Sequence, residues 1–328
     1  TGATPITIGN PDLKWERTLS TNIGVDFTAF RGRVDLSADY YIKNTDNLLL
    51  DITKAPSVGV TTSRENIGEV QNSGFELRLR TFPIQNKDWQ WSLGLTYAYN
   101  KNKIKKISNS LREQNEKNKA DNGVAPLPIY EEGQSLTALK VVPSAGIDPV
   151  TGQEIFIKRD GTYTFVYDSN DKVIFGDTNP IGTGSINSYL TYKRFALSCS
   201  FLYSFGGSLY NETLATKVEG ANPKYNADER VLNDRWKTPG TIAKYKRIDD
   251  TTTPYQTSRF VEKNNFLRMS SLSLSYEVPT TFIQKYGLKR MFLELLTNDL
   301  FYLSTAKRER GLNYPYDRSF EFSVRFSL

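Results

Sequence analysis

The chain has 328 residues, a net charge of +6 and 38% hydrophobic residues, with a mean hydropathy of −0.49. It contains no histidine and a single cysteine, Cys199, which excludes histidine-based zinc sites, Ser-His-Asp triads, Cys-His dyads and an internal disulfide framework within this chain. No stretch approaches the roughly 18–20 apolar residues of a membrane helix, and the basic residues are scattered among acids, which argues against nucleic-acid binding.

Nine segments in which apolar and polar residues alternate predict nine β-strands, and little of the chain has a helical period. In chain order these segments are 22–29, 34–42, 75–80, 91–100, 186–192, 195–205, 271–278, 291–295 and 319–328. Tight turns, such as Phe30–Arg33 and Tyr192–Phe195, join neighbouring segments. The pattern predicts an all-β chain built on an antiparallel sheet.

The connections alternate between short and long. Short turns are expected near residues 31–32, 83–88 and 193–194, with a longer one near 279–290. Long loops are expected near 49–66, 101–182, 209–264 and 304–318. In an up-and-down sheet, alternate connections emerge at the same end, so the long loops should gather at one end and the short turns at the other. This asymmetry is typical of transmembrane β-barrels and uncommon in compact soluble domains.

The two faces of the predicted strands differ in chemistry. The polar face suits a wet barrel lumen, and the residues expected to face it are Asp26, Asp35, Asp39, Glu76, Arg78, Arg80, Glu277, Glu321 and Arg325. The apolar face often ends in tyrosine or tryptophan, as interfacial girdles do, although these residues favour any sheet. In the last strand the residues expected to face lipid are Phe320, Phe322, Val324, Phe326 and Leu328. We therefore interpret the chain as an antiparallel transmembrane β-barrel, with a soluble β-protein as the alternative.

The long loops contain several local patterns. Thr151-Gly152 and Asp160-Gly161 predict small hairpins. The charged run Lys101–Ala120 is interpreted as a solvated loop in preference to a short surface helix. Asp168 begins a sequence similar to a calcium loop, but Lys172 stands where the EF-hand spacing needs an oxygen ligand, so a β-turn is preferred.

No pattern of residues predicts catalysis, because adjacent carboxylates such as Glu131 and Glu132 point to opposite faces of a strand. We expect no enzyme activity and no cofactor, and we assign no metal ligand. Aromatic residues in the loops are the candidates for ligand contact, since a flat ring stacks on a sugar face or packs against a peptide. They are Tyr130, Trp236, Tyr245, Tyr255, Tyr314 and Tyr316. The alternative is that these rings hold the loops to one another.

Six segments resemble, in family order, the C-terminal barrel portion of SusC-like (SusC/RagA family) TonB-dependent outer-membrane transporters of Bacteroidota. The segments are IGNPDLKWERT (Ile8–Thr18), NIGEVQNSGFELRL (Asn66–Leu79), AGIDPVTGQEIF (Ala145–Phe156), GDTNP (Gly176–Pro180), FLYSFGGSLYN (Phe201–Asn211) and FVEKNNFLRMSSLSLSYEVP (Phe260–Pro279). One departure is the inserted Asp299 between Asn298 and Leu300 in the pattern that precedes the last strand.

The resemblance implies a 22-stranded barrel occluded by an N-terminal plug, with about nine to eleven strands of its C-terminal part in this chain. No plug and no TonB box are recognised in the chain, so the remaining barrel strands, and TonB acting through the plug, are expected partners. The resemblance further implies the outer membrane, and import of an oligosaccharide or peptide with a SusD-like surface lipoprotein. The alternatives are a siderophore or cobalamin importer of the same fold and a soluble extracellular glycan-binding module or adhesin.

Overall fold

The computed structural model describes the whole chain except residues 1–8, 54–61, 223, 226, 311–314 and 328. Its main element is a ten-stranded antiparallel sheet in the order β1-β2-β3-β4-β10-β11-β12-β13-β15, in which β14 also pairs with β12. The strands are β1 (Arg17–Ala29), β2 (Val34–Thr53), β3 (Thr62–Gln85), β4 (Trp89–Ile107), β10 (Gly182–Tyr192), β11 (Phe195–Tyr210), β12 (Val261–Glu277), β13 (Arg290–Asn298), β14 (Tyr302–Ser304) and β15 (Phe320–Ser327). The predicted all-β antiparallel fold is confirmed. The ten strands of this main sheet fall within the predicted range of about nine to eleven.

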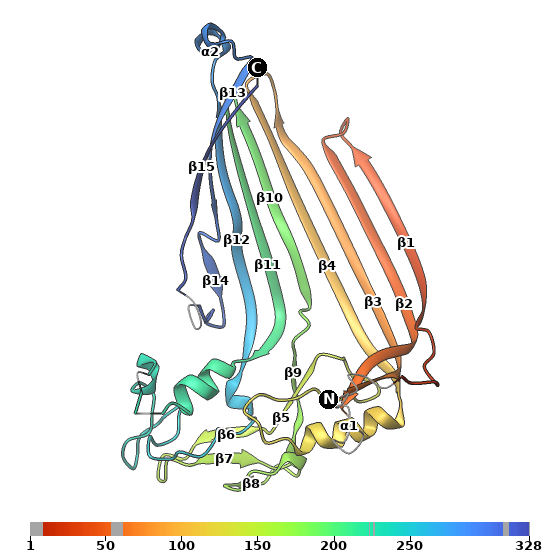
Figure 1. Cartoon of the computed structure of the whole chain (residues 1–328), viewed down its shortest axis with the longest axis vertical. Coiled ribbons are helices and arrows are strands. Elements are labelled where there is room, and N and C mark those ends of the chain that lie inside the picture. The colour runs from red at the N-terminus through yellow and green to blue at the C-terminus, as the bar shows by residue number, and fades with distance from the viewer. Residues whose placement is uncertain (1–8, 54–61, 223, 226, 311–314, 328) are drawn as a thin grey trace, which may run out of the picture.

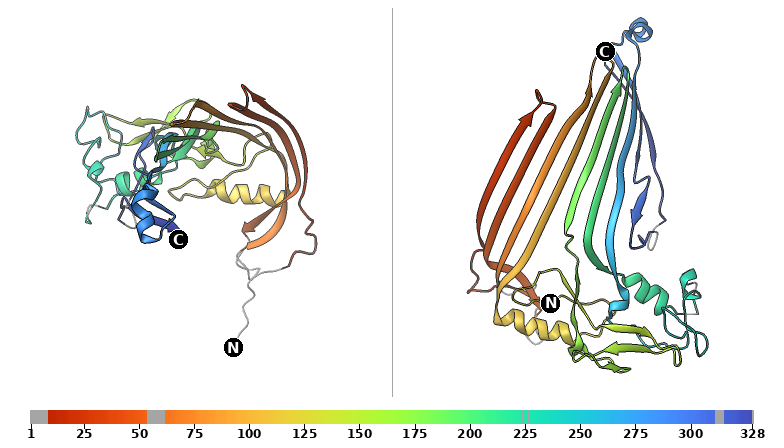
Figure 2. Two further views of the ribbon diagram at one scale, coloured as in Figure 1. Left: turned by 90° about the horizontal axis from the view of Figure 1, so that it is seen from above. Right: turned by 180° about the vertical axis from the view of Figure 1, so that it is seen from behind.

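The sheet is long and curved (Figures 1 and 2). Seen from above, its strands follow an arc, and the helix α1 (Asn109–Ala120) lies inside that arc. The strands β1 and β15 form the two edges, and within the described residues neither pairs with a further strand. The described chain is therefore an open section of curved wall.

Short and long connections lie at opposite ends of the sheet (Figure 1). The turn after β1 is tight, with positive φ angles at Phe30, Arg31 and Gly32, and Lys193 makes a similar turn after β10. The same end carries α2 (Thr280–Ile283) and η6 (Gln284–Tyr286). Within the described residues no helix has the length and apolar character needed to cross a membrane.

At the other end, the strands run farther than the sequence pattern indicates. β2 continues to Thr53, β3 begins at Thr62 and β4 continues to Ile107. These extensions remain paired, with Thr53 opposite Thr62 and Gly68 opposite Ile107. The sheet therefore projects into the region that the alternation assigns to loops.

The solvated loop predicted for Lys101–Ala120 is wrong, because the segment is the end of β4 followed by α1. Ser108 caps the helix by accepting a hydrogen bond from the Leu111 amide at 3.2 Å. Leu111 is 1% exposed and packs with Ile52 and Ile67 of the extended strands. One buried leucine thus fixes a helix whose other residues are almost all polar.

Between β4 and β10 the chain forms two small sheets at the loop end. β5 (Ala138–Val141) pairs with β9 (Val173–Asp177), and β6 (Ser144–Ile147), β7 (Glu154–Ile157) and β8 (Tyr163–Thr164) form a meander. The two predicted hairpins are confirmed, with Gly152 and Gly161 at φ angles of 73° and 84° in their turns.

Three short helical turns and one π-helix complete the loop end. They are η2 (Ser169–Asp171), the π-helix η3 (Leu214–Glu219), η4 (Glu229–Val231) and η5 (Ser258–Phe260). Asp168 caps η2 through a 2.8 Å hydrogen bond from the Asn170 amide. This capped turn occupies the place where the sequence suggested a β-turn or a calcium loop.

The inserted Asp299 is accommodated by a break in strand pairing. Asn298 at the end of β13 pairs with Ser271 of β12, and pairing with the same strand resumes in β14, where Tyr302 lies opposite Arg268. Asp299 itself has a φ of 52°. An extra residue between two paired stretches bulges out of the ladder and bends the strand.

The buried apolar clusters lie at the loop end, where the extended ends of β2 and β3 contribute to one of them. One cluster contains Ala215, Val218, Tyr245 and Phe260, and a second contains Ile52, Ile67 and Leu111. We call residues 109–181 and 211–260, which pack around these clusters, the loop lobe. The lobe has its own core, whereas the sheet has two accessible faces.

Candidate functional site

One face of the sheet is lined by polar and charged side chains. The strand registers place the nine residues predicted to line a lumen on this face: Asp26, Asp35, Asp39, Glu76, Arg78, Arg80, Glu277, Glu321 and Arg325. Several are linked across strands: Ser37 donates a 2.6 Å hydrogen bond to Asp26, and Arg78 donates one of 3.2 Å to Ser37. A hollow of about 560 Å³ lies over this row. The face therefore offers a hydrated, hydrogen-bonding surface.

The loops fold over this polar face near its loop end. Asn100 and Asn102 donate to the side-chain oxygen of Asn72 at 3.2 and 2.9 Å, and Asn102 in turn accepts from the Leu136 amide at 2.9 Å. Because α1, which leads into this segment, lies inside the arc (Figure 2), the polar face is the concave one. The loop lobe partly covers the space that the wall encloses.

The opposite face of the sheet is apolar and exposed. Ile23 and Phe27 on β1 are 68% and 55% exposed, and Phe322 and Phe326 on β15 are 65% and 63% exposed. The residues predicted to face lipid all lie on this convex face, except Leu328, which is outside the described residues. Continuous apolar surface of this kind marks contact with another apolar phase or partner.

Aromatic rings gather at two levels of the convex face. Near the short turns, Trp89 stacks on Tyr192 with ring centroids 4.1 Å apart, and Phe195 lies 4.7 Å from Tyr276. Toward the loops, the Tyr97 centroid lies 6.3 Å from that of Phe205. The apolar side chains of the strands lie between these two levels.

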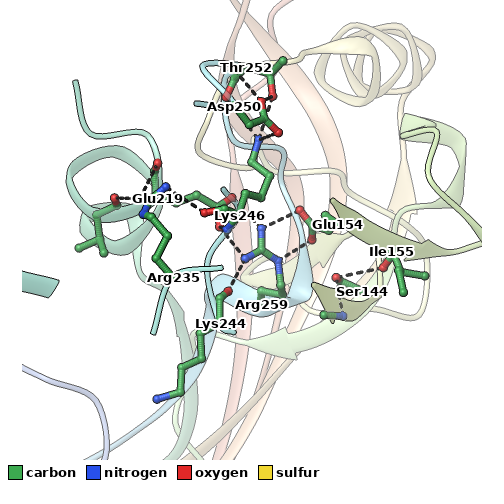
Figure 3. Close-up of polar contacts among 12 residues, drawn as sticks. Ser144, Glu154, Ile155, Glu219, Arg235, Lys244, Lys246, Asp250, Thr252 and Arg259 are labelled. Atoms are coloured by element: carbon green, nitrogen blue, oxygen red, sulfur yellow. Dashed lines mark hydrogen bonds and ion pairs between the residues drawn. The ribbon is translucent and has the colours of Figure 1, made fainter. Parts of the chain in front are cut away.

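A buried ion cluster joins the segments of the loop lobe (Figure 3). Arg259 donates to both carboxylate oxygens of Glu154 at 2.7 Å and to those of Glu219 at 2.6 and 2.7 Å. It also donates to the Lys244 carbonyl at 2.7 Å. The side chains of Arg259, Glu154 and Glu219 are 9%, 2% and 0% exposed. We call these three residues the Arg259 cluster.

Electrostatics keep Arg259 charged. Burial opposes the charge on Arg259, but hydrogen bonds to Glu154 and Glu219 outweigh it and raise the pKa of the guanidinium. Arg235, also buried, donates to the carbonyls of Val218, Glu219, Val231 and Lys246. The cluster and Arg235 together tie β7, η3 and the chain before β12 into one unit.

A second ion cluster links two loops that are far apart in sequence. Arg230 donates to Asp228 at 2.7 and 2.8 Å and to Glu309 at 2.8 and 3.1 Å. The Arg230 hydrogen bonds hold the pKa of the Asp228 carboxyl well below its usual range. This link joins the loop lobe to the connection between β14 and β15.

Acid should release this second link. A carboxyl whose folded pKa is depressed stabilises the folded state above its unfolded pKa of about 3.9, and this contribution is lost as the pH falls through the folded pKa. We expect amides 228–235 to lose protection in hydrogen–deuterium exchange, corrected for intrinsic rates, only below about pH 4. Arg230→Gln should lose the same protection already at pH 7. Unchanged protection between pH 6 and pH 2 in the native protein would contradict the assignment.

The structure places four of the six candidate ligand-contacting rings within the loop lobe, namely Tyr130, Trp236, Tyr245 and Tyr255. Tyr245 is 9% exposed and belongs to its core. Trp236 donates through its indole to the Pro149 carbonyl at 2.8 Å and lies against Gly152. Tyr130 is half-buried against the cluster around Leu111 and also lines a pocket beside α1.

The other two described candidate rings, Tyr255 in the loop lobe and Tyr316 outside it, make separate packing contacts. Tyr255 stacks on Tyr167 with centroids 4.3 Å apart, and Arg310 lies over the exposed Tyr316 ring at 4.1 Å. Tyr314 is outside the described residues. These packing contacts favour the reading that the rings hold loops together, and contact with a ligand stays a prediction.

Sequence reasoning missed the Arg259 cluster. Its members are separated by 105 and 40 positions, so no local spacing connects them. The only available indication was that Glu154 and Arg259 each lie within or next to a segment that matches a family motif. Among the residues that the structure describes, no group of three histidine, cysteine, aspartate or glutamate side chains is arranged to hold a metal ion.

Comparison with known proteins identifies the fold. Residues 1–128 match the family described as TonB dependent receptor-like, beta-barrel. Over these residues the chain is similar to a TonB-dependent receptor β-barrel domain. The resemblance to SusC-like receptors inferred from the motifs is therefore confirmed, together with the β-barrel fold class.

Relatives of this TonB-dependent receptor domain come from Bacteroidota. The chain is 30% identical to TonB-dependent receptor P3 of Formosa agariphila over 87% of its own length and 29% of that protein, and 27% identical to TonB-dependent receptor SusC of Bacteroides thetaiotaomicron over 81% and 26%. The RagAB peptide importer in its closed-closed state has the same fold, with a TM-score of 0.79, 23% identity and coverage of 98% and 36%. The chain spans about a third or less of the curated relatives that it matches.

Proposed function

We propose that this chain forms the C-terminal section of the wall of an outer-membrane, TonB-dependent importer of a large nutrient, an oligosaccharide or a peptide. The observation that carries the proposal is the curved sheet with a hydrated concave face, an apolar convex face and its long loops at one end. In this arrangement the nine polar-face residues line the lumen, and the convex residues of β15 face lipid. The wall itself performs no bond chemistry.

The convex face has the dimensions that a bilayer requires. Between the two aromatic levels, β10 runs for 11 residues from Gly182, which lies under the Phe205 and Tyr97 rings, to Tyr192. This distance is roughly 33 Å along the strand. At the tilt of about 40° usual for membrane barrels, it spans about 25 Å, the height of their apolar band.

The two free edges support a larger barrel. An unpaired strand edge is not tolerated in lipid, because its amides and carbonyls have no water to bind. We therefore infer that further strands of the same polypeptide pair with β1 and β15, that a plug closes the lumen and that TonB acts through it. The loop lobe, at the end opposite the short turns, would meet a SusD-like surface lipoprotein. Both partner inferences rest on the likeness to SusC.

The location is tested with the full-length protein. We expect it to fractionate with the outer membrane, to need detergent for extraction and to migrate differently on a gel before and after heating. A deletion strain should lose growth on one class of polymeric carbon or peptide source while growing normally on its monomers. Solubility in buffer without detergent would contradict the proposal and favour the soluble glycan-binding module or adhesin.

The second candidate function is a siderophore or cobalamin importer of the same fold. The deletion strain described above also distinguishes this function from import of a large nutrient. Loss of growth when a ferric siderophore is the only iron source, or when cobalamin must be taken up, with no defect on polymeric nutrients, would favour it. The likeness to SusC and to the RagAB peptide importer supports a large nutrient.

A further inference from the structure

A basic pocket lies beside α1 in the loop lobe. It has a volume of about 250 Å³ and is bounded by α1 and the chain segments 129–140 and 159–172. Five of its lining residues are basic, namely Arg112, Lys119, Lys140, Arg159 and Lys172, and two are acidic, namely Glu116 and Glu131. Cations are thus in clear excess over carboxylates.

Two of the lysines are almost completely buried. Lys140 is 5% exposed and forms an ion pair with Glu131. Lys172 is 3% exposed, and its ammonium donates to the carbonyls of Lys119 and Asp121 at 3.2 and 3.5 Å, at the C-terminal end of α1. A cation is favourable at that end of a helix.

Lys172 retains capacity for an anion. An ammonium group has three donors, and the two carbonyls account for two of them. It forms no ion pair with the carboxylates that the structure describes, and burial lowers the pKa of its ammonium. A negatively charged ligand would therefore stabilise Lys172 in its charged form.

Arg159 lies next to Lys172 with most of its donors free. One guanidinium nitrogen donates to the Lys172 carbonyl at 3.1 Å. Its side chain forms no ion pair in the described part of the chain, so the rest of the planar fork remains available for a carboxylate. Lys119 also lines the pocket without a described acidic partner.

We propose that this pocket binds the carboxylate of a hexuronate unit in an acidic oligosaccharide. Arg159 and Lys172 take the carboxylate, and the sugar ring lies beside Tyr130, which lines the same pocket. The inference rests on the proposed import function and names the class of its cargo. It also gives Tyr130, one of the candidate aromatic residues, the role of contacting the sugar ring.

The pocket favours a sugar over a peptide on two grounds. Its volume is below the roughly 300–1,000 Å³ of drug-sized sites, so it accommodates one unit and not a length of chain. Recognition of an extended peptide usually draws on a row of main-chain donors and acceptors. In this pocket the donors offered to the ligand are the side chains of Arg159 and Lys172.

The test is calorimetric titration of the detergent-solubilised full-length protein with trigalacturonate. We expect binding that weakens as salt rises, because the contacts are ionic. Arg159→Gln should weaken it about tenfold or more, the usual effect of losing a charge-assisted hydrogen bond. Lys158→Gln is the matched control, since it removes the same charge from the exposed neighbouring residue, which does not line the pocket. It should change the affinity less than about twofold.

Three results would overturn the inference. They are absence of trigalacturonate binding, equal weakening by Lys158→Gln, and equal or tighter binding of triglutamate or of the same trisaccharide with its carboxylates reduced to alcohols. The import proposal is judged separately, by detergent requirement and growth. Binding of the neutral sugar or the peptide, with failure of the uronate, would leave import standing and remove only the uronate pocket.

Discussion

Replacing Arg259 with methionine should open the loop lobe while the wall of the sheet stays folded. The substitution leaves the carboxylates of Glu154 and Glu219 buried without their cation, and both side chains are at most 2% exposed. Removing one partner of a buried ion cluster costs about 3–5 kcal/mol. We expect thermolysin to cut within residues 211–260 at least a hundredfold faster than in the native protein, with unchanged heat-modifiable migration of the barrel.

Two further variants separate the buried charges from a general loss of an arginine. Arg64 forms a comparable bidentate pair with Asp51, but its side chain is 62% exposed and that of Asp51 is 52% exposed. Arg64→Met should therefore leave the protease resistance of the lobe close to that of the native protein. Replacing Arg259, Glu154 and Glu219 together by methionine removes all three charges and should recover most of the protease resistance. Equal protease sensitivity of the Arg64 and Arg259 variants would show that the cluster does not hold the lobe.

The strands were predictable because alternation is a local property. Successive side chains of a strand point to opposite faces of the sheet. The alternation of apolar and polar residues in Phe322, Ser323 and Val324 therefore predicts which face each side chain occupies. The sequence could not show how far β2, β3 and β4 extend beyond the alternating segments. There the extended strands pack against α1 through Ile52 and Ile67, and this burial breaks the simple polar–apolar rule.

The helix α1 was not predicted, because its sequence also lacks a regular apolar pattern. Its sequence is almost entirely polar and charged, and a single apolar residue, Leu111, fixes it to the sheet. Two asparagines complete the attachment: Asn115 and Asn118 donate to the carbonyls of Tyr130 and Pro128 at 2.6 and 2.7 Å. No periodic apolar stripe marks such a helix, because hydrogen bonds to the segment that follows it replace most of the apolar packing.

The two parts of the candidate site, the polar face of the sheet and the loop lobe, also differed in how far the sequence could predict them. The polar face of the wall follows from strand parity, and its residues could be named from the sequence. The loop lobe depends on pairings such as Glu154 with Arg259 and Asp121 with Gln256, which join segments more than 100 positions apart. Composition indicates that aromatic and charged residues are present in the loops, but only the folded chain shows that Tyr245 is in a core and that Lys172 is in a pocket.

Substituting aspartate for both Phe322 and Phe326 should abolish insertion into the outer membrane. Both rings lie on the convex face of β15, opposite Leu295 and Met291 of β13, and are more than 60% exposed. A charged side chain facing the bilayer interior costs up to about 2–3 kcal/mol, and each substitution also loses the transfer of an aromatic ring into lipid. The readouts are the amount of protein in the outer-membrane fraction and its heat-modifiable migration.

The matched control places the same two charges on the other face of the same strand. Ser323 and Ser327 alternate with the two phenylalanines and share the concave face with Arg325 and Glu321. Aspartates at these two positions would face the hydrated lumen, so Ser323→Asp with Ser327→Asp should insert at near-native levels. The contrast depends only on which face of β15 meets lipid, since charge, strand and chain length are the same in both variants. Normal insertion of the phenylalanine variant, or equal failure of both, would refute the membrane assignment of the convex face.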